Sequence, residues 1–63
     1  MKNDLKERRE TADMSQADLA AAVDVTRQTI NAIERERYDP SLKLAFELAD
    51  YFECSIESIF DPE

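Results

Sequence analysis

Four side chains between residues 27 and 35 carry the hydrogen-bonding groups needed to recognise the edges of base pairs. They are Arg27, Gln28, Asn31 and Arg35. On a helix with about 100° per residue, these four fall within about 100° of one another, and the apolar Ile30 and Ile33 fall on the other side. A guanidinium can donate two hydrogen bonds to guanine, and a carboxamide can pair with the donor and acceptor of adenine. The pattern predicts an amphipathic helix with one face suited to base-pair edges.

A second short helix and a tight turn must hold this polar face in place. Ser15 and Asp18 stand three residues apart, which is the spacing of a capping box at the start of a helix over residues 16–23. Thr26 supplies a capping hydroxyl directly before the polar helix over 27–35. Asp24 lies between the two helices, where the turn needs a residue that tolerates a left-handed backbone conformation.

Three further helices complete the prediction of one all-α domain over residues 1–63. An apolar stripe that contains one charged residue marks a helix over 2–12: Met1, Leu5, Arg9 and Ala12. Pro40 interrupts the helical pattern, after which Ser41 caps a helix over 42–52 and Ser55 caps a short helix over 56–60. The helix over 42–52 has a wide apolar arc that predicts a central place in the core: Leu42, Leu44, Ala45, Phe46, Leu48, Ala49, Tyr51 and Phe52.

The inventory of reactive side chains is poor. The 63 residues include no histidine, no glycine and one cysteine, Cys54, which we expect to pack in the interior. General acid–base catalysis, a phosphate-binding glycine loop, a zinc site and an internal disulfide all lack the residues they require. We therefore predict a protein that is not an enzyme and uses no metal or cofactor. With no long apolar run and no signal pattern, we expect a cytoplasmic protein without membrane association.

The net charge of −7 is unevenly distributed along the chain. Residues 26–43 carry four basic and three acidic side chains, whereas residues 44–63 carry six acidic side chains and no basic one. The stretch that is not acidic therefore coincides with the predicted polar helix and the loop after it. This asymmetry is what a nucleic-acid-binding face requires on a protein that is otherwise acidic.

Four ordered segments of the chain resemble the Cro and lambda-repressor family of helix-turn-helix regulators, also called the XRE family. The segments are Ser15-Gln16-Ala17-Asp18-Leu19-Ala20, Val25-Thr26-Arg27-Gln28-Thr29-Ile30-Asn31-Ala32-Ile33-Glu34, Tyr38-Asp39-Pro40-Ser41-Leu42-Lys43-Leu44-Ala45 and Ser55-Ile56-Glu57-Ser58-Ile59-Phe60. The resemblance covers nearly the whole chain and is closest to small, stand-alone members. It implies a compact five-helix domain that docks the helix over 27–35 in the major groove of double-stranded DNA.

The resemblance also implies a role for each polar residue. Arg27, Gln28 and Asn31 are expected to read base edges, and Gln16 to bond a phosphate and support the first reader. The remaining phosphate contacts are expected from Thr26, Arg35, Arg37, Tyr38 and Lys43. For each of these, an ordinary solvated surface residue is the alternative interpretation.

Two further expectations concern structure and not DNA contact. The family pairs an arginine of its first helix with a glutamate of its third, and the matching residues here are Arg9 and Glu34. This pairing accounts for a charged residue within an apolar stripe. The chain departs from the family by lacking glycine, with Asp24 at the turn and Glu36 after the reading helix. We expect these two helix ends to be strained by about 1 kcal/mol each.

The acidity allows two interpretations, because negative charge opposes DNA binding. In the first, which we favour, the protein works in a cytoplasm of very high salt, where the Debye length is about 3 Å at 1 M and the acidic residues are screened from DNA. In the second, the acidic face binds a protein partner. The corresponding functions are a sequence-specific transcriptional regulator, expected to be a repressor, and an antitoxin-like or adaptor module that neutralises a basic protein.

We expect a homodimer that binds a palindromic operator, because one reading helix covers too few bases and two-fold pairing places two such helices in successive major grooves about 34 Å apart. The residues expected at the dimer contact are Phe46, Tyr51, Ile56, Ile59 and Phe60. The same residues could instead complete the core of the monomer.

Overall fold

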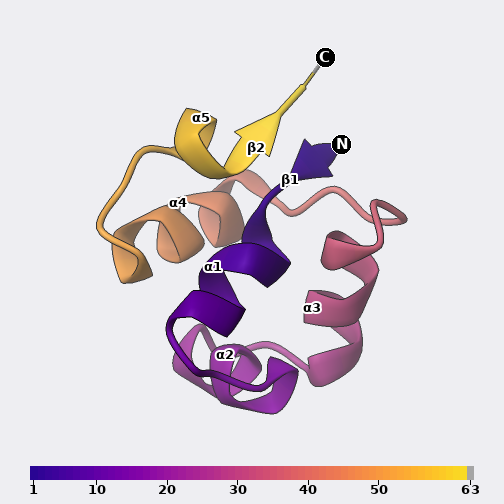
Figure 1. Cartoon of the computed structure of the whole chain (residues 1–63). Coiled ribbons are helices and arrows are strands. Elements are labelled where there is room, and N and C mark those ends of the chain that lie inside the picture. The colour runs from indigo at the N-terminus through magenta and orange to yellow at the C-terminus, as the bar shows by residue number, and fades with distance from the viewer. Residues whose placement is uncertain (63) are drawn as a thin grey trace.

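Five helices and two very short strands make up the computed structural model, which describes residues 1–62 (Figure 1). In chain order they are β1 (Lys2–Asn3), α1 (Leu5–Thr11), α2 (Gln16–Ala22), α3 (Arg27–Glu34), α4 (Leu42–Tyr51), α5 (Ile56–Ile59) and β2 (Phe60–Asp61). The predicted all-α class is confirmed, since over residues 1–62 the only addition to the helices is a ladder two residues long. In Figure 1, α1 lies between α3 on one side and α4 on the other, with α2 below it.

The first helix begins at Leu5 and not at residue 2, because the residues before it pair with the other end of the described chain. Strands β1 and β2 are antiparallel, with Lys2 opposite Asp61 and Asn3 opposite Phe60. Asn3 also bridges two elements: its Nδ2 donates to the Ile33 carbonyl at 2.8 Å, and its Oδ1 accepts from the Leu5 amide at 3.1 Å. The expected helix over 56–60 likewise ends at residue 59, because Phe60 is extended in β2.

The core takes apolar side chains from every helix. The largest side chains with no more than 1% exposure are Leu5, Leu19, Ile30, Ile33 and Leu48. The wide apolar arc predicted for α4 is only partly interior: Leu44, Ala45, Leu48 and Ala49 are buried, whereas Leu42, Phe46 and Tyr51 are exposed. The arc is wider than the face that one helix can bury against a core this small, so both of its margins reach solvent.

Each of α2 to α5 starts with a hydroxyl that accepts a hydrogen bond from a backbone amide three residues later, at 3.0–3.3 Å. These caps are Ser15, Thr26, Ser41 and Ser55. At α2 the predicted capping box is complete, because the Asp18 carboxylate also accepts from the Ser15 amide at 3.0 Å. Hydrogen bonds from the Ser15 amide and hydroxyl hold the pKa of Asp18 below its usual value.

The ends of α1 to α4 share one geometry that normally uses glycine. The residue after each C-cap has a positive φ of 54–61°, and in every case it is acidic: Asp13, Asp24, Glu36 and Glu53. Its amide donates to the carbonyl three residues back, and the next amide donates to the carbonyl five residues back, as in Asp13 to Glu10 and Met14 to Arg9. This pair of bonds is a Schellman motif, which satisfies the last carbonyls of a helix. The sequence indicated Asp24 and Glu36, but Asp13 and Glu53 were not predicted.

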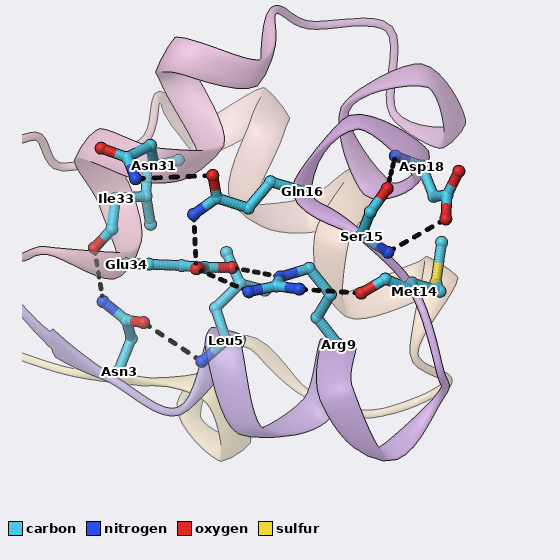
Figure 2. Close-up of polar contacts among 10 residues, drawn as sticks. All are labelled: Asn3, Leu5, Arg9, Met14, Ser15, Gln16, Asp18, Asn31, Ile33 and Glu34. Carbon is cyan, nitrogen blue, oxygen red and sulfur yellow. Dashed lines mark hydrogen bonds and ion pairs between the residues drawn. The ribbon is translucent and has the colours of Figure 1, made fainter.

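A buried ion pair joins α1 to α3 (Figure 2). Arg9 donates from Nε to Glu34 Oε2 at 2.8 Å and from Nη2 to Glu34 Oε1 at 3.2 Å, and the two side chains are 10% and 3% exposed. A third donor of Arg9, Nη1, bonds the Met14 carbonyl at 2.8 Å, beyond the end of α1. The hydrogen bond to Glu34 raises the pKa of Arg9 above its usual value, so the guanidinium stays charged despite burial.

Replacing an acidic residue of positive φ by glycine should stabilise the protein. For Glu36→Gly and Glu53→Gly we expect about 1 kcal/mol each, because glycine adopts this conformation without strain and no longer places a negative charge at a helix C-terminus. Thermal unfolding should shift upward by about 4–8 °C per substitution. Asp50→Gly, an acidic-to-glycine change inside α4, should instead lower stability by about 1 kcal/mol. Equal shifts from all three variants would contradict the argument.

Removing one member of the buried ion pair should be costly. We expect Arg9→Met to lower the free energy of unfolding by about 3–5 kcal/mol, because the buried Glu34 side chain would lose its ion-pair partner. Arg8→Met is the matched control, since Arg8 pairs with Asp4 at 2.9 Å where the two side chains are 29% and 41% exposed. That loss should stay below about 1 kcal/mol. Urea titration followed by circular dichroism measures both, and similar losses would refute the special role of Arg9.

Candidate nucleic-acid interface

The outward face of α3 carries the side chains predicted to read DNA. Arg27 and Gln28 are exposed on its first turn, Asn31 is partly buried one turn later, and Arg35 is the exposed C-cap. Ile30 and Ile33 on the opposite side are no more than 1% exposed. The helix is therefore anchored by its apolar side, and its polar side is presented to solvent at the amino-terminal end.

Helix α2 packs across α3, and the contact between them is polar where it meets the reading face. Gln16, the first residue of α2, accepts at Oε1 from Asn31 Nδ2 at 3.4 Å and donates from Nε2 to Glu34 Oε1 at 3.0 Å. Figure 2 shows these bonds as one chain that continues through Glu34 to Arg9 and Met14. The resemblance had implied that Gln16 supports the first reader of the helix. The structure instead bonds Gln16 to Asn31, one turn later.

The residues predicted to contact phosphate lie in three places. Thr26 is the N-cap of α3, and its hydroxyl is shared between the Thr29 amide at 3.3 Å and the Thr29 hydroxyl at 3.1 Å. Arg35 and Arg37 are exposed at the end of α3 and in the loop that follows. Tyr38 and Lys43 line a shallow groove beside Thr29, which they share with two acidic residues, Asp24 and Glu47. The structure therefore brings acidic and basic groups together on this side of α3.

Acidic side chains also gather next to the start of α2. Glu10, Asp13 and Asp18 line one shallow groove at the corner between α1 and α2, together with Met14 and Ser15. Gln16 follows this groove directly in the chain. The electrostatic potential at the amino-terminal end of α2 is thus less favourable to a phosphate than the helix dipole alone would make it.

The five residues predicted at a dimer contact do not form one surface. Ile59 and Phe60 are each 3% exposed and complete the core of the chain itself, so the expectation that they meet a partner is corrected. Tyr51 is 44% exposed but lies about 140° around α4 from Phe46, and its hydroxyl donates to the Met14 sulfur at 3.4 Å. Phe46 is 57% exposed, and Ile56 is partly buried.

A residue that the sequence analysis assigned to the core is the most exposed large apolar side chain of the described chain. Leu42 is 69% exposed and stands one turn before Phe46 on the same side of α4. It lines an apolar groove with Met1, Pro40, Ala45, Ile56 and Phe60. The width of the apolar arc could have indicated that Leu42 is exposed, since an arc broader than the buried face of a helix predicts an exposed margin.

Within residues 1–62, no helix has the length and apolar character needed to cross a membrane.

Two curated relatives match this chain over nearly the full length of both sequences. A family model described as helix-turn-helix matches residues 5–59. The chain is 55% identical over 60 residues to an uncharacterized HTH-type transcriptional regulator, MJ0272, of Methanocaldococcus jannaschii, covering 95% of this chain and 91% of that protein. It is 45% identical over 60 residues to the uncharacterized HTH-type transcriptional regulator YgzD of Bacillus subtilis, with 95% and 91% covered.

A longer protein contains a similar unit. The structure of hydroxypropylphosphonic acid epoxidase from S. wedmorenis matches 92% of this chain with a TM-score of 0.79 and 30% sequence identity. The match covers only 31% of the epoxidase chain, so it concerns a helical unit shared with an enzyme and not the whole enzyme. The family model and the regulators matched over nearly their full length decide the assignment. This chain belongs to the XRE-type helix-turn-helix family of DNA-binding transcriptional regulators, and it is not an enzyme.

Proposed function

We propose that the protein is a sequence-specific regulator that places α3 in the major groove of a palindromic operator. The observation that carries this proposal is the outward face of α3. Arg27, Gln28 and Asn31 lie on the amino-terminal part of this face, and the opposite, apolar side of the helix is buried. A helix-turn-helix protein docks this end of its reading helix against base edges. Each bidentate pairing with a guanine or an adenine would contribute about 1–3 kcal/mol of discrimination.

The basic residues at the other end of α3 would set register and affinity. Arg35 and Arg37 are exposed where α3 ends, and Lys43 is exposed at the start of α4. Charges in these positions suit the phosphate backbone on either side of the groove. Contacts to phosphate strengthen binding to all sequences alike and carry no base preference of their own.

High salt offers a consistent account of the acidic surface. The net charge is −7, and acidic groups line both the groove at the α1–α2 corner and the groove beside Thr29. At low salt these groups would repel the phosphates, whereas at 1 M salt the Debye length is about 3 Å and only direct contacts count. We propose that base contacts supply a larger share of the affinity here than in a basic domain, with a correspondingly shallow dependence on salt.

Two copies would bind one operator and act as a repressor by occupying it. The exposed pair Leu42 and Phe46, one turn apart on α4, forms an apolar margin next to the groove lined by Ile56. Contact across a two-fold axis would bury this margin and hold two α3 helices about 34 Å apart.

An adaptor function is the alternative that the charge distribution favours. Residues 44–63 carry six acidic side chains and no basic one, which suits a basic protein partner. Under that alternative, DNA recognition would be secondary. Co-purification of a basic partner would favour the adaptor, whereas the selection experiment below tests the regulator.

Selection of bound fragments from genomic DNA, carried out at 0.1 M and at 1 M salt, tests the regulator. We expect one palindrome with two short half-sites to be enriched, because two copies present the same reading helix about one turn of DNA apart. Enrichment of no sequence in either condition would overturn the proposal and favour the adaptor.

Two variants test the division of labour on α3. Gln28→Ala should relax the preference at one base pair of each half-site, whereas Arg35→Ala should weaken binding to all sequences alike and reduce the slope of affinity against salt by about 1. Both are measured by fluorescence anisotropy on the selected operator and on its single-base variants. If the two variants changed affinity and preference in the same way, the assigned roles would be wrong.

Phe46→Glu should separate the two copies without unfolding either one. Phe46 is 57% exposed, so the charge costs the monomer little but would be buried in the proposed contact. Light scattering should then report a monomer, and binding to the palindrome should weaken by about 100-fold while binding to one half-site is unchanged. Tyr51→Glu, at a 44% exposed aromatic on the other margin of α4, is the control and should leave the dimer intact. A dimeric Phe46→Glu variant would exclude this surface.

A further inference from the structure

We propose that Asn3 is a positioning residue for the reading helix. Its carboxamide ties the carboxy-terminal turn of α3 to the ladder of β1 and β2, which borders the proposed dimer contact, and thereby sets the distance between half-sites that two copies accept. This inference rests on the proposed function, since only a dimer on a palindrome has such a distance. Asn3 lies before residue 5, where the match to the helix-turn-helix family begins, so this contact is not among the features by which the family is recognised.

Every polar group of the Asn3 side chain is bonded to the backbone. Its Nδ2 donates to the Ile33 carbonyl at 2.8 Å and to the Met1 carbonyl at 3.3 Å. Its Oδ1 accepts from the Leu5 amide at 3.1 Å (Figure 2). A carbonyl can only accept and a backbone N–H can only donate, so exchanging the oxygen and nitrogen of the carboxamide would set like groups against each other at all three bonds. The surrounding backbone therefore fixes the orientation of this side chain.

The two ends of the carboxamide serve different helices. The N-cap of α1, Asp4, makes no capping hydrogen bond with its side chain, and Asn3 Oδ1 supplies an acceptor to the first amide of α1 instead. The Ile33 carbonyl belongs to the last turn of α3, where carbonyls lack partners within the helix. It accepts from Asn3 and from the Glu36 amide, at 3.0 Å. Because the two roles use different atoms, a substitution can remove one and keep the other.

Asn3 also connects α3 to the proposed dimer contact. In the ladder it stands opposite Phe60, which lines the apolar groove beside that contact. Met1, whose carbonyl accepts from Asn3, lines the same groove. Asn3 therefore lies between the surface that would meet the second copy and the helix that would read DNA.

A small change at this end of α3 is large on the scale of DNA. The helix has eight residues and is therefore about 12 Å long. The ion pair between Arg9 and Glu34 would remain without Asn3, so α3 would tilt about that point and not detach. A tilt of about 10° displaces one end of the helix relative to the other by about 2 Å. In a two-fold dimer the displacement occurs twice and reaches about 4 Å, more than the rise of about 3.4 Å per base pair.

Asn3→Ser and Asn3→Asp test the hold on α3 in the free protein. Both keep an acceptor for the Leu5 amide, but the serine hydroxyl is one bond shorter than the carboxamide, and the aspartate carboxylate has no donor. Residual dipolar couplings should show α3 tilted in both variants, with α1 and α4 unchanged relative to each other. Lys2→Ser, at an exposed residue of the same strand, is the control and should leave all helix directions unchanged. An unchanged α3 in both Asn3 variants would overturn the inference.

Two further NMR measurements separate a local hold from general stability. In the wild type, scalar coupling across the hydrogen bond should join the Asn3 side-chain nitrogen to the Ile33 carbonyl carbon. Its absence from spectra that resolve the backbone couplings of α3 would overturn the inference. In Asn3→Ser, the Glu36 amide should exchange with solvent about 5-fold faster. The Glu53 amide, which ends α4 with the same geometry, is the matched control, and equal acceleration of both amides would overturn the local role.

The DNA arm uses the selected operator and two altered operators, with half-sites one base pair closer or farther apart. The wild type should prefer the selected spacing, because two rigidly held reading helices fit one separation. In Asn3→Ser we expect this preference to fall about 5- to 10-fold, with the base preference within each half-site unchanged. Lys2→Ser should keep the wild-type preference for spacing. A merely structural role would weaken binding to all three operators by the same factor, and that result would overturn the inference.

The failure of the inference and the failure of the proposed function give different results. If the wild type selected no DNA sequence, the proposed function would fall, and the direction of α3 in the variants would still decide whether Asn3 holds this helix. If the wild type selects a palindrome but both Asn3 variants keep its preference for spacing, the inference fails while the regulator stands.

Discussion

The ion pair between Arg9 and Glu34 is the interaction on which the arrangement of α1, α2 and α3 depends. Its two charges are nearly fully buried, so each must remain beside the other or leave an uncompensated charge in the interior. Arg9 also bonds the Met14 carbonyl where α1 turns into α2, and Glu34 also accepts from Gln16 on α2. One pair of side chains is therefore hydrogen-bonded to three successive elements: α3, the turn between α1 and α2, and the start of α2.

Local signals explain why most of the fold was predictable from the sequence. A helix N-cap can be predicted from about four consecutive residues. All four predicted caps form: Ser15, Thr26, Ser41 and Ser55. The apolar side of α3 also follows from its period alone. Long-range pairing leaves no such signal: nothing near Lys2 or Asn3 indicates that residues about 58 positions away will pair with them.

The candidate site was predictable in its residues but not in its connections. The polar face of α3 is visible in the spacing of Arg27, Gln28 and Asn31, whereas the bond between Asn31 and Gln16 depends on the angle at which α2 crosses α3.

Exposure was harder to foresee than polarity. Leu42 and Ala45 have the same apolar character on one helix, yet only Ala45 is buried, because burial depends on which neighbour covers each side. The positive φ of Asp13 and Glu53 could not be predicted for another reason: acidic residues are common throughout this sequence, so an acidic residue does not mark the end of a helix.

The pairing of β1 with β2 gives this small domain the properties of a module. Because the two strands are antiparallel, the described chain enters and leaves at one corner, and α2 and the start of α3 lie at the opposite end of the molecule (Figure 1). A sequence added before β1 or after β2 would begin far from the amino-terminal end of α3, so the same unit can be carried within a longer polypeptide without rebuilding its core. The epoxidase, in which a similar unit occupies about a third of the chain, illustrates that such an arrangement occurs.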